Sequence, residues 1–328
     1  MSRVLCSGSL LCDLIAADLP RIGEPGDLVY APRGISLHAG GHAANVAISL
    51  AQLGRSGVAV VGSIGDDIFG GFLEDELKER GVGVYSERIA GTHTAKNLVL
   101  VVKGQDRRFI AELSANTLLG PRHVLDALEE TNPDIFYQGT VGGLRKVDRD
   151  LGTLLDAAKE RGTLTVVDVV RPYKGGWDGL KGVYPSIDIL HCNCTEAEAL
   201  TGEKNPAVAS GALVEGGIRL ALVTMGGRGL IAAWSREKLR LPAFEVKTID
   251  PTGAGDAFCA GIIDAFLRSP RKPEGWSLDQ ARPLLLEGSA AGAACVTAAG
   301  ATTAVTRENV DAMIFNRGAE VWQRAVTV

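Results

Sequence analysis

Short apolar runs rich in β-branched residues alternate with helical patterns along most of this chain. The runs occupy 58–62, 134–138, 163–168, 187–192 and 218–224. The helical patterns occupy 43–53, 67–80, 121–130, 148–161 and 206–216. Because the runs are apolar on both faces, each is typical of a strand in a parallel sheet that is covered on both sides. The alternation predicts an α/β fold, with a doubly wound, mostly parallel sheet between two layers of helices.

Two segments depart from this alternation. Residues 14–38 contain several glycine and proline interruptions and no helical period. Residues 94–113 have the pattern of a hairpin, with two alternating strands around a turn at 103–106. We expect strands from both segments to form a small sheet that projects from the main domain. The alternative is that they are edge strands and surface loops.

Charge and hydrophobic content argue against a nucleic-acid-binding protein and against a membrane protein. The 328 residues are 46% hydrophobic, which is enough for one large α/β domain or two smaller ones. The net charge is −5 and no lysine or arginine cluster recurs on one face, so nucleic acid is not an expected partner. The apolar N-terminal run is interrupted by Ser7, Gly8, Ser9 and Asp13, which fits neither a signal peptide nor a membrane span.

Cysteine placement predicts reduced thiols. The chain has 6 cysteines, mostly inside apolar runs, as expected for buried thiols of a cytoplasmic protein. His191, Cys192 and Cys194 lie close together, but no second cysteine or histidine pair completes four ligands. We therefore do not expect a metal site there.

A glycine-rich turn stands between a strand-like run and a helical pattern in VKTIDPTGAGDAFCAGIIDAF, 246–266. Gly253 and Gly255 let the backbone approach a ligand, and the N–H groups of 253–256 can converge on an anion at the start of the helix. No lysine and serine or threonine pair follows the glycines, so this turn is not a nucleotide P-loop. Asp256 would stand beside the anion as a base for an attacking hydroxyl. The alternative is an ordinary aspartate in a first helical turn.

A second glycine pair opens a helical pattern in GGHAANVAISLAQLG, 40–54. Apolar residues recur on one side of this segment, as in a helix with a buried face. Asn45, in the first turn, would place an amide where the loop meets a ligand. Tight packing explains the glycine pair equally well.

Both stretches resemble the signature regions of the ribokinase-like (PfkB) family of carbohydrate kinases. The N-terminal region is 40–70 and the C-terminal region is DPTGAGDAFCAGI, 250–262. Between them, HCNCTEAEALTG resembles the family's Asn-x-x-Glu motif, and VTMGGRGLI resembles its turn beside the nucleotide. The resemblance runs in order over most of the chain.

This resemblance implies a role for each matched residue. Asp256 would be the catalytic base, and Gly253, Ala254, Gly255 and Asp256 would form the anion hole. The acceptor would be bound by Asp13, which follows the first strand, and by Gly40, Gly41, His42 and Asn45. ATP would contact Asn193, Thr224, Gly226 and Gly229. Asn193 and Glu196 would order Mg²⁺ and phosphate through water, and a monovalent cation such as K⁺ would bind near Asp250 and Thr252.

The resemblance also implies the organisation of the protein. The family fold is a three-layer α/β/α domain with a mostly parallel central sheet and a small β-sheet lid. The chain would then be a single kinase domain, 1–328, with the lid formed by insertions near 14–38 and 94–113. Lids of the family often pair, so a homodimer through the lid is expected.

Two departures from the family pattern bear on the substrate. Ribokinases carry lysine where this chain has His42, and an acidic residue near Gln138 and Gly139 that this chain lacks. Ribose is therefore not the favoured substrate. His42 either contacts the substrate or is hydrogen-bonded to its own loop, and Arg171 is expected on the surface.

The leading hypothesis is an ATP-dependent kinase that phosphorylates a hydroxyl of a small sugar or sugar derivative. A nucleoside kinase of the same family and a catalytically inactive regulator that binds nucleotide or sugar are the alternatives. No G-x-G-x-x-G follows the first strand, which disfavours a dinucleotide-dependent dehydrogenase. The chain is 5% aromatic, and the lid segments offer only Tyr30 and Phe109 for stacking on a base. A polyhydroxylated sugar or sugar acid therefore fits better than a nucleoside.

Overall fold

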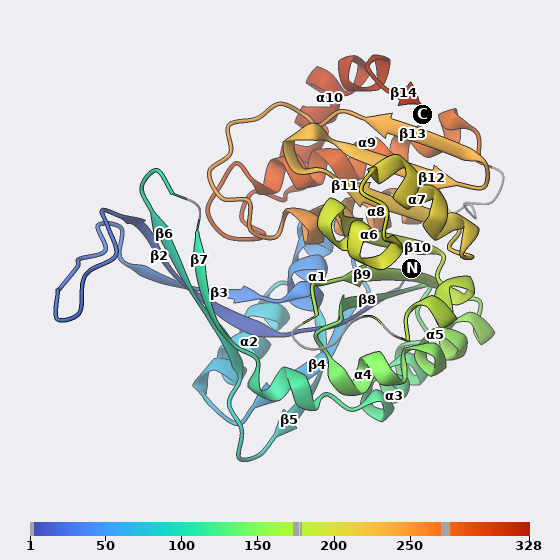
Figure 1. Ribbon diagram of the computed structural model, residues 1–328. Coiled ribbons are helices and arrows are strands. Elements are labelled where there is room, and N and C mark those ends of the chain that lie inside the picture. The colour runs from blue at the N-terminus through green and yellow to red at the C-terminus, as the bar shows by residue number, and fades with distance from the viewer. Residues whose placement is uncertain (1–2, 106, 173–176, 178, 270–275) are drawn as a thin grey trace.

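The computed structural model describes residues 3–105, 107–172, 177, 179–269 and 276–328. The chain forms two sheets, and the smaller one projects from one side of the main body (Figure 1). The large sheet has 10 strands in the order β14-β13-β12-β11-β10-β9-β8-β1-β4-β5. The bounds of its strands are β1 Val4–Ser7, β4 Val58–Gly65, β5 Gly83–Ile89, β8 Ile135–Val141, β9 Leu164–Val169, β10 Ile189–Asn193, β11 Leu220–Thr224, β12 Leu230–Trp234, β13 Glu237–Leu241 and β14 Val326–Thr327.

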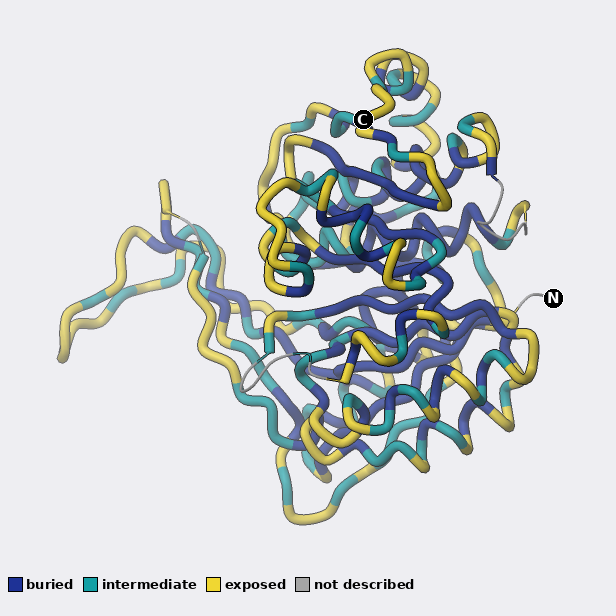
Figure 2. Tube along the Cα trace, turned by 45° about the vertical axis from the view of Figure 1, so that its right-hand side comes forward, coloured by how far each residue is buried: buried dark blue, intermediate teal, exposed yellow. Residues whose placement is uncertain are grey.

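Helices cover both faces of the large sheet. Alternate residues of each central strand point into opposite cores: Val4 and Cys6 pack into one hydrophobic cluster, and Leu5 packs into the other. The first cluster includes α1 His42–Gln52, α8 Ala254–Arg268, α9 Leu278–Cys295 and α10 Arg307–Gln323. The second includes α3 Pro121–Thr131, α5 Leu151–Glu160, α6 Cys194–Thr201 and α7 Pro206–Glu215. Buried strands between partly exposed helices are visible along the chain in Figure 2, so the predicted three-layer α/β arrangement is confirmed.

The five predicted apolar runs all lie in strands and the five predicted helical patterns all lie in helices, with one helix divided. The segment 148–161 contains the end of α4, Arg145–Arg149, and all of α5. Asp148 accepts hydrogen bonds from the backbone N–H groups of Gly142 and Leu144, which holds the turn before α4 and starts that helix early. The remaining helices are α2 Ile68–Glu79 and the 3₁₀ turns η1 Ser114–Leu118, η2 Lys181–Ser186 and η3 Gly226–Arg228.

The strand-like run before the glycine-rich turn is not a strand. The predicted run begins at Val246, and residues 242–248 have no regular secondary structure. The edge of the sheet is instead built by antiparallel strands: β12 pairs with β11, β13 pairs with β12, and β14 pairs with the far side of β13. The run instead crosses to α9, where Ile249 N–H donates to the carbonyl of Val296 at 2.7 Å. It therefore lies beside the helices rather than in the sheet.

The small sheet contains four strands in the order β3-β2-β6-β7. Their bounds are β2 Leu11–Leu19, β3 Ile35–Gly40, β6 Ala95–Val102 and β7 Arg108–Glu112. The predicted projecting sheet is thus confirmed, and the alternative of edge strands and loops is wrong. The β6–β7 turn includes 103–105, whereas Asp106 of the predicted turn lies outside the described residues.

Asp13 lies inside β2 rather than in a loop after the first strand, because β1 ends at Ser7 and β2 already begins at Leu11. It is opposite His38 of β3 and Asn97 of β6. Since side chains alternate between the faces of a sheet, Leu14 belongs to the opposite face. That face carries a row of apolar residues in register: Leu37, Leu14, Leu98 and Ile110.

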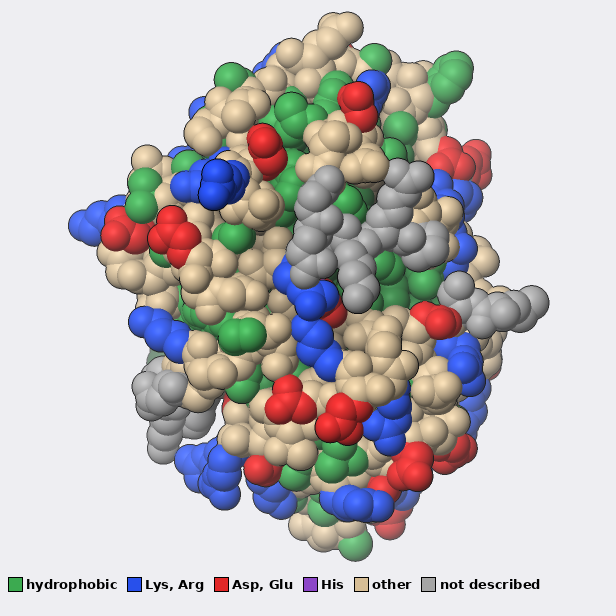
Figure 3. Space-filling model, turned by 90° about the vertical axis from the view of Figure 1, so that its right-hand side faces the viewer, with side chains coloured by type: hydrophobic (Ala, Val, Ile, Leu, Met, Phe, Trp, Pro, Cys, Tyr) green, Lys and Arg blue, Asp and Glu red, His purple; other side chains and the backbone are tan. Residues whose placement is uncertain are grey.

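The outer surface is mixed in charge. Figure 3 shows acidic and basic side chains interspersed over the face that it presents.

None of the described helices combines the length and apolar character needed to span a bilayer. All 6 cysteines are free thiols, and only Cys194 is not fully buried.

Candidate active site

The glycine-rich turn forms the N-terminus of α8. Gly253 caps the helix with φ of 77°, a left-handed conformation that favours glycine, and a Cβ there would lie 2.8 Å from the backbone of Ala301. The first N–H groups of a helix have no carbonyl partner within it, and they carry its positive dipole end. Asp256 lies in this first turn and is only 6% exposed. A buried carboxylate thus stands beside a set of backbone donors suited to an anion.

The second glycine pair brings α1 to the same place. Gly41 caps α1 with φ of 94°, and Asn45 lies in its first turn. The amide Nδ2 of Asn45 donates to Oδ2 of Asp256 at 2.8 Å. Its Oδ1 is buried, and no donor among the described residues reaches it. A buried acceptor without a donor is costly, so a ligand hydroxyl would satisfy it well.

His42 occupies the space on the other side of Asp256. Its Nδ1 accepts a hydrogen bond from the N–H of Thr140 at 2.8 Å, which places the proton of the neutral ring on Nε2. Nε2 lies 3.8 Å from Oδ1 of Asp256, which is beyond direct hydrogen-bond distance. Thr140 holds this contact from a left-handed conformation, with φ of 59°. His42 is therefore both bonded to a neighbouring loop and turned toward the carboxylate.

Asp13 enters from the small sheet. It is 5% exposed, and its Oδ1 accepts a hydrogen bond from Nδ2 of Asn97 at 2.9 Å. Its Oδ2 lies against the α-carbon of Gly40. Burial raises the pKa of Asp13, and the nearby negative charges of Asp250 and Asp256 raise it further. Asp13 of the small sheet thus faces the same negatively charged region as Asp256 at the start of α8.

Burial is also the main reason why the pKa of Asp256 is raised, and the charge of Asp168 adds to that effect. His42 and the hydrogen bond from Asn45 oppose it. Burial lowers the pKa of His42, but the charges of Asp256, Asp168 and Glu196 outweigh burial and leave it raised. A carboxylate with a raised pKa is a stronger proton acceptor, which suits a general base.

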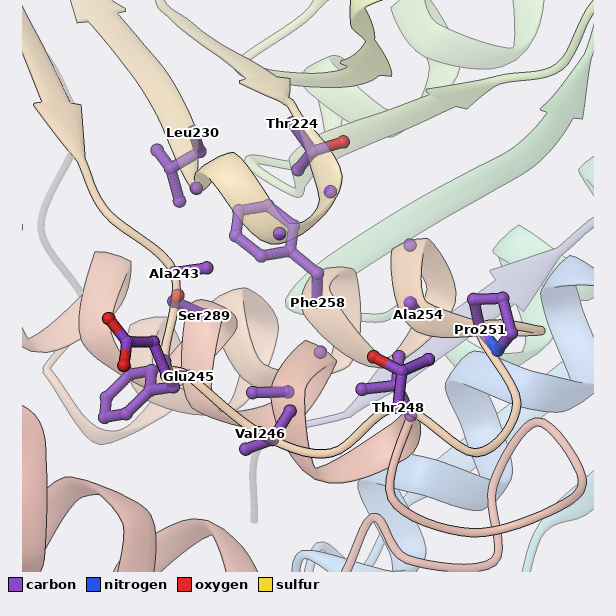
Figure 4. A pocket seen from close by; sticks show the side chains of 18 residues that line it. Thr224, Leu230, Ala243, Glu245, Val246, Thr248, Pro251, Ala254, Phe258 and Ser289 are labelled. Carbon is purple, nitrogen blue, oxygen red and sulfur yellow. The ribbon is translucent and has the colours of Figure 1, made fainter.

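A cavity of about 400 Å³ lies next to the N-terminus of α8 (Figure 4). From the predicted nucleotide and anion residues, its lining includes Thr224, Gly226, Gly229, Ala254 and Gly255. The rest of the lining is largely apolar, and Figure 4 shows the ring of Phe258 among the residues that face it. No lysine or arginine is among the described residues that line it. The cavity has the size and character of a site for a nucleotide.

The structure places Asn193 and Glu196 outside this lining, in a capping box at the start of α6. Oδ1 of Asn193 accepts from the N–H of Glu196 at 3.0 Å, and Oε2 of Glu196 accepts from the N–H of Asn193 at 2.8 Å. Asn193 and Glu196 therefore cap α6. The second carboxylate oxygen of Glu196 takes no part in the box, and it fits a metal-bound water chemically.

Asp250 and Thr252 form a tight turn ahead of the anion hole. Oδ1 of Asp250 accepts from N–H and Oγ1 of Thr252 at 2.9 and 2.6 Å, and Oδ2 accepts from the N–H of Gly300 at 3.1 Å. Arg107, which precedes β7 of the small sheet, brings its guanidinium to 3.7 Å from Oδ1. The Asp250 carboxylate therefore accepts three hydrogen bonds and lies next to one positive charge.

Sequence reasoning missed a buried pair next to the anion hole. Nδ1 of His191 lies 2.8 Å from Oδ1 of Asp168, and the two residues face each other in the β9–β10 register. Tyr137 donates its hydroxyl to the other carboxylate oxygen at 2.9 Å. The sequence did contain a signal for this pair: the apolar run TLTVVD ends in the charged residue Asp168, and the next predicted strand ends near His191.

The remaining predicted positions are placed as follows. His191 does not share a cluster of potential metal ligands with Cys192 or Cys194 among the described residues; its neighbours in such a cluster are Asp168 and Cys259. Arg171 is exposed, as predicted. Gln138 is fully buried and bonds the carbonyl of Gly139 at 2.9 Å.

Several known proteins resemble this chain in sequence and in fold. The pfkB family of carbohydrate kinases matches residues 1–308. A probable fructokinase of Arabidopsis thaliana is 32% identical over 285 residues, which cover 81% of this chain and 84% of that protein. A ribokinase of Haemophilus influenzae is 27% identical over 307 residues, or 91% of this chain and 93% of that protein. The crystal structure of a putative ribokinase II from E. coli, in complex with ATP and Mg²⁺, superposes with a TM-score of 0.79 at 21% identity, covering 96% and 99% of the two chains.

Proposed function

The chain belongs to the pfkB family of carbohydrate kinases and is an ATP-dependent sugar kinase, and on that premise we propose that Asp256 is its catalytic base. The observation that carries the proposal is the position of this buried carboxylate, at the anion-hole turn and between Asn45 and His42. Asp256 takes the proton of the acceptor hydroxyl while N–H groups of 253–256 stabilise charge on the transferred phosphoryl group.

The acceptor lies between the two sheets. Asn45 offers it the buried Oδ1 that has no donor among the described residues, and Asp13 offers a carboxylate. Nε2 of His42 lies 3.8 Å from Oδ1 of Asp256, so a hydroxyl at the side of the pair can reach both atoms at hydrogen-bond distance. Gly40 and Gly41 let Asp13 and Ser9 approach the backbone closely at the same edge, so they support the acceptor site through its packing. A site of this kind selects a small polyhydroxylated sugar or sugar derivative.

ATP occupies the cavity beside α8, with its triphosphate directed at the anion hole. Thr224, Gly226 and Gly229 line the nucleotide end, and Ala254 and Gly255 line the phosphate end. Mg²⁺ would neutralise charge on the phosphates when bound. Glu196 would hold a metal-bound water through the carboxylate oxygen that the capping box does not use, and Asn193 would orient phosphate through water. A monovalent cation such as K⁺ would bind near Asp250 and Thr252, with Arg107 as a second positive charge 3.7 Å from the Asp250 carboxylate.

A nucleoside acceptor is the second candidate. Stacking on a base needs a flat aromatic surface at the acceptor site. Tyr30 is 76% exposed, and the ring of Phe109 lies 5.3 Å from the guanidinium of Arg107. Tyr30 thus lies mostly in solvent, and the face of the Phe109 ring is already next to a cation. A sugar therefore fits the site better.

The small sheet acts as a lid on a single kinase domain that spans 1–328. Its outward face exposes Leu37, Leu98 and Ile110, which are 37%, 43% and 60% exposed. These residues lie in register with Leu14, as one apolar row. A second copy of the chain covers this row and forms a homodimer through the lid. Free buried thiols agree with a cytoplasmic location.

The proposal is tested by Asp256→Asn together with a coupled ADP-release assay against a panel of sugars and nucleosides. We expect turnover of the best sugar, with fructose and ribose at the head of the panel, to fall roughly 10²–10⁴-fold in the variant. ATP affinity, measured by calorimetry, should remain close to wild type. If the variant keeps more than about a tenth of the turnover, Asp256 is not the base. If the wild type phosphorylates nothing in the panel, the alternative of an inactive regulator is favoured.

A further inference from the structure

His191 is buried directly beneath the anion hole. It is 5% exposed, and a Cβ on Gly255 would lie 3.1 Å from its Cε1. Its ring centroid is 5.2 Å from that of Phe258, and its Nε2 is 3.2 Å from Oγ1 of Thr224. Gly255, Phe258 and Thr224 all line the nucleotide cavity. The imidazole therefore backs the wall where the phosphates are expected.

The partner of His191 is a second buried acid next to the base. Asp168 is 3% exposed and is bound by Nδ1 of His191 at 2.8 Å and by the hydroxyl of Tyr137 at 2.9 Å. One oxygen of Asp168, one oxygen of Asp256 and one nitrogen of His42 all lie within 4.8 Å of one another. Two carboxylates at this separation in a buried region repel each other strongly when both are ionised.

The repulsion makes the charge of His191 important for Asp256. With His191 protonated, the pair with Asp168 has no net charge, and Asp256 can lose its proton next to it. Burial lowers the pKa of His191, but the charge of Asp168 and its hydrogen bond outweigh burial and leave the pKa raised. The pKa of Asp168 is lowered, because His191 and the hydroxyl of Tyr137 outweigh the burial that would raise it. Both directions agree with an ion pair.

We propose that His191 is a positioning residue that keeps Asp256 ready to accept a proton, by neutralising Asp168 in a buried ion pair beneath the anion hole. This inference rests on the proposed role of Asp256 as the base. It adds a residue whose contribution is electrostatic and acts through Asp168, without contact with the acceptor. The lining of the nucleotide cavity contains no lysine or arginine among the described residues, so no basic group of that wall duplicates this charge.

Other titratable groups surround Asp256 and must stay constant in the test. Those that interact with Asp256 are His42 of α1, Asp13 of β2, Tyr137 of β8, Asp168 of β9, His191 of β10, Cys259 of α8 itself and Cys295 of α9. Glu196 of α6 acts on His191 and His42. Burial raises the pKa values of Tyr137, Cys259 and Cys295 far enough that all three stay neutral between pH 5 and 8. Only the histidines and the acids contribute charge there.

The experiment measures kcat/KM for the sugar as a function of pH, at saturating MgATP, in the wild type and three variants. His191→Gln removes the charge and keeps a hydrogen-bond donor for Asp168. The acid limb of the profile should move to higher pH by roughly one to two units, because a lost positive charge can only strengthen proton binding by the remaining acids. His191→Lys keeps a positive charge and should retain the wild-type limb. Asp168→Asn/His191→Gln removes both charges and should return the limb toward the wild type.

The outcomes separate this inference from the proposed function. A loss of activity in His191→Gln that is equal at every pH and is not relieved in the double variant would show a purely structural role. An unshifted limb in His191→Gln, with Asp256→Asn inactive, would overturn the inference and leave Asp256 as the base. If Asp256→Asn itself keeps its activity and its acid limb, the proposed function fails and the inference fails with it. Ionisation of ATP is common to all variants, so differences between their limbs report on the protein.

Discussion

The carboxylate of Asp13 lies so close to Gly40 that a Cβ at position 40 would stand 3.0 Å from Cγ of Asp13 and would overlap its Oδ2. The two residues belong to the paired strands β2 and β3. The glycine is needed here for space, since its φ is not left-handed. The first signature region thus begins with a residue whose missing side chain makes room for the acid of the small sheet.

Asp13→Ala should raise the acceptor KM by roughly 100-fold or more, because a buried carboxylate that binds hydroxyls contributes about 1.5–3 kcal/mol per hydrogen bond. Gly40→Ala should have a similar effect by displacing the same carboxylate. Steady-state kinetics with varied acceptor and varied ATP would show the change, with the KM for ATP nearly constant as the internal control. Equal increases in both KM values would mean that the substitutions disturb the fold and not the acceptor site.

Glu196→Gln should raise the Mg²⁺ concentration needed for half-maximal turnover by roughly 10-fold or more. Glutamine at this position still completes the capping box with Asn193, so α6 should remain intact. A Mg²⁺ titration at fixed ATP, with circular dichroism on both proteins, measures the two properties separately. An unchanged titration would reduce Glu196 to its helix-capping role.

Acceptor binding should slow hydrogen exchange in the small sheet, at 95–102 and 108–112, if the sheet closes over the sugar. The contact that holds it is the approach of Arg107 to Asp250, at 3.7 Å. Arg107→Gln should reduce the protection, whereas Arg108→Gln, on the next residue, should not. Equal exchange with and without sugar in the wild type would identify the sheet as a fixed scaffold.

Asp67 should contribute stability that depends on pH. It caps α2 through the N–H of Gly70 at 3.0 Å and accepts the N–H and hydroxyl of Thr94 at 2.9 and 2.7 Å. Burial would raise its pKa, but these hydrogen bonds outweigh burial and hold the pKa below the ordinary 3.8. The folded value is the lower one, so the contribution is complete above pH 3.8 and is lost as pH falls through the folded pKa.

Urea unfolding of the wild type and Asp67→Asn between pH 2.5 and 7 checks this. We expect the wild type to be more stable by about 1 kcal/mol at neutral pH, and the difference should shrink below pH 4. Asp66→Asn is the matched control, because Asp66 is paired with Arg88 at the exposed surface, 3.3 Å from its guanidinium. A difference that stays constant down to pH 2.5 would show that the charge of Asp67 is not involved.

Much of the large sheet follows from the sequence. Each predicted apolar run lies in a strand, because a run that is buried on both faces has few other places in an α/β fold. The edge was harder to predict. The strands β12, β13 and β14 are antiparallel, and the run from Val246 is not a strand even though its local composition resembles one. Local strand propensity does not indicate which of several segments will pair with the edge of a sheet.

The candidate active site also contains residues that the sequence predicts and residues that it does not. Glycine turns are read directly from the chain, so the positions of Gly41, Gly253 and Asp256 at helix N-termini were predictable. The pair of Asp168 and His191 was not, because its members come from neighbouring strands and meet only through the register of β9 and β10. The contact between Arg107 and Asp250 was missed for a similar reason, since it joins the two sheets.

Thr140 is a β-branched residue with φ of 59°, a conformation that costs such residues on the order of 1–3 kcal/mol. In that conformation its N–H holds His42, and its hydroxyl lies 2.9 Å from Oγ of Ser9. Glycine or asparagine would relieve the backbone, but neither supplies the same hydroxyl. A laboratory selection for heat resistance alone should therefore replace Thr140 early, and a selection that also demands sugar phosphorylation should retain it. The strained backbone of Thr140 thus lowers the stability of the fold and in exchange positions His42.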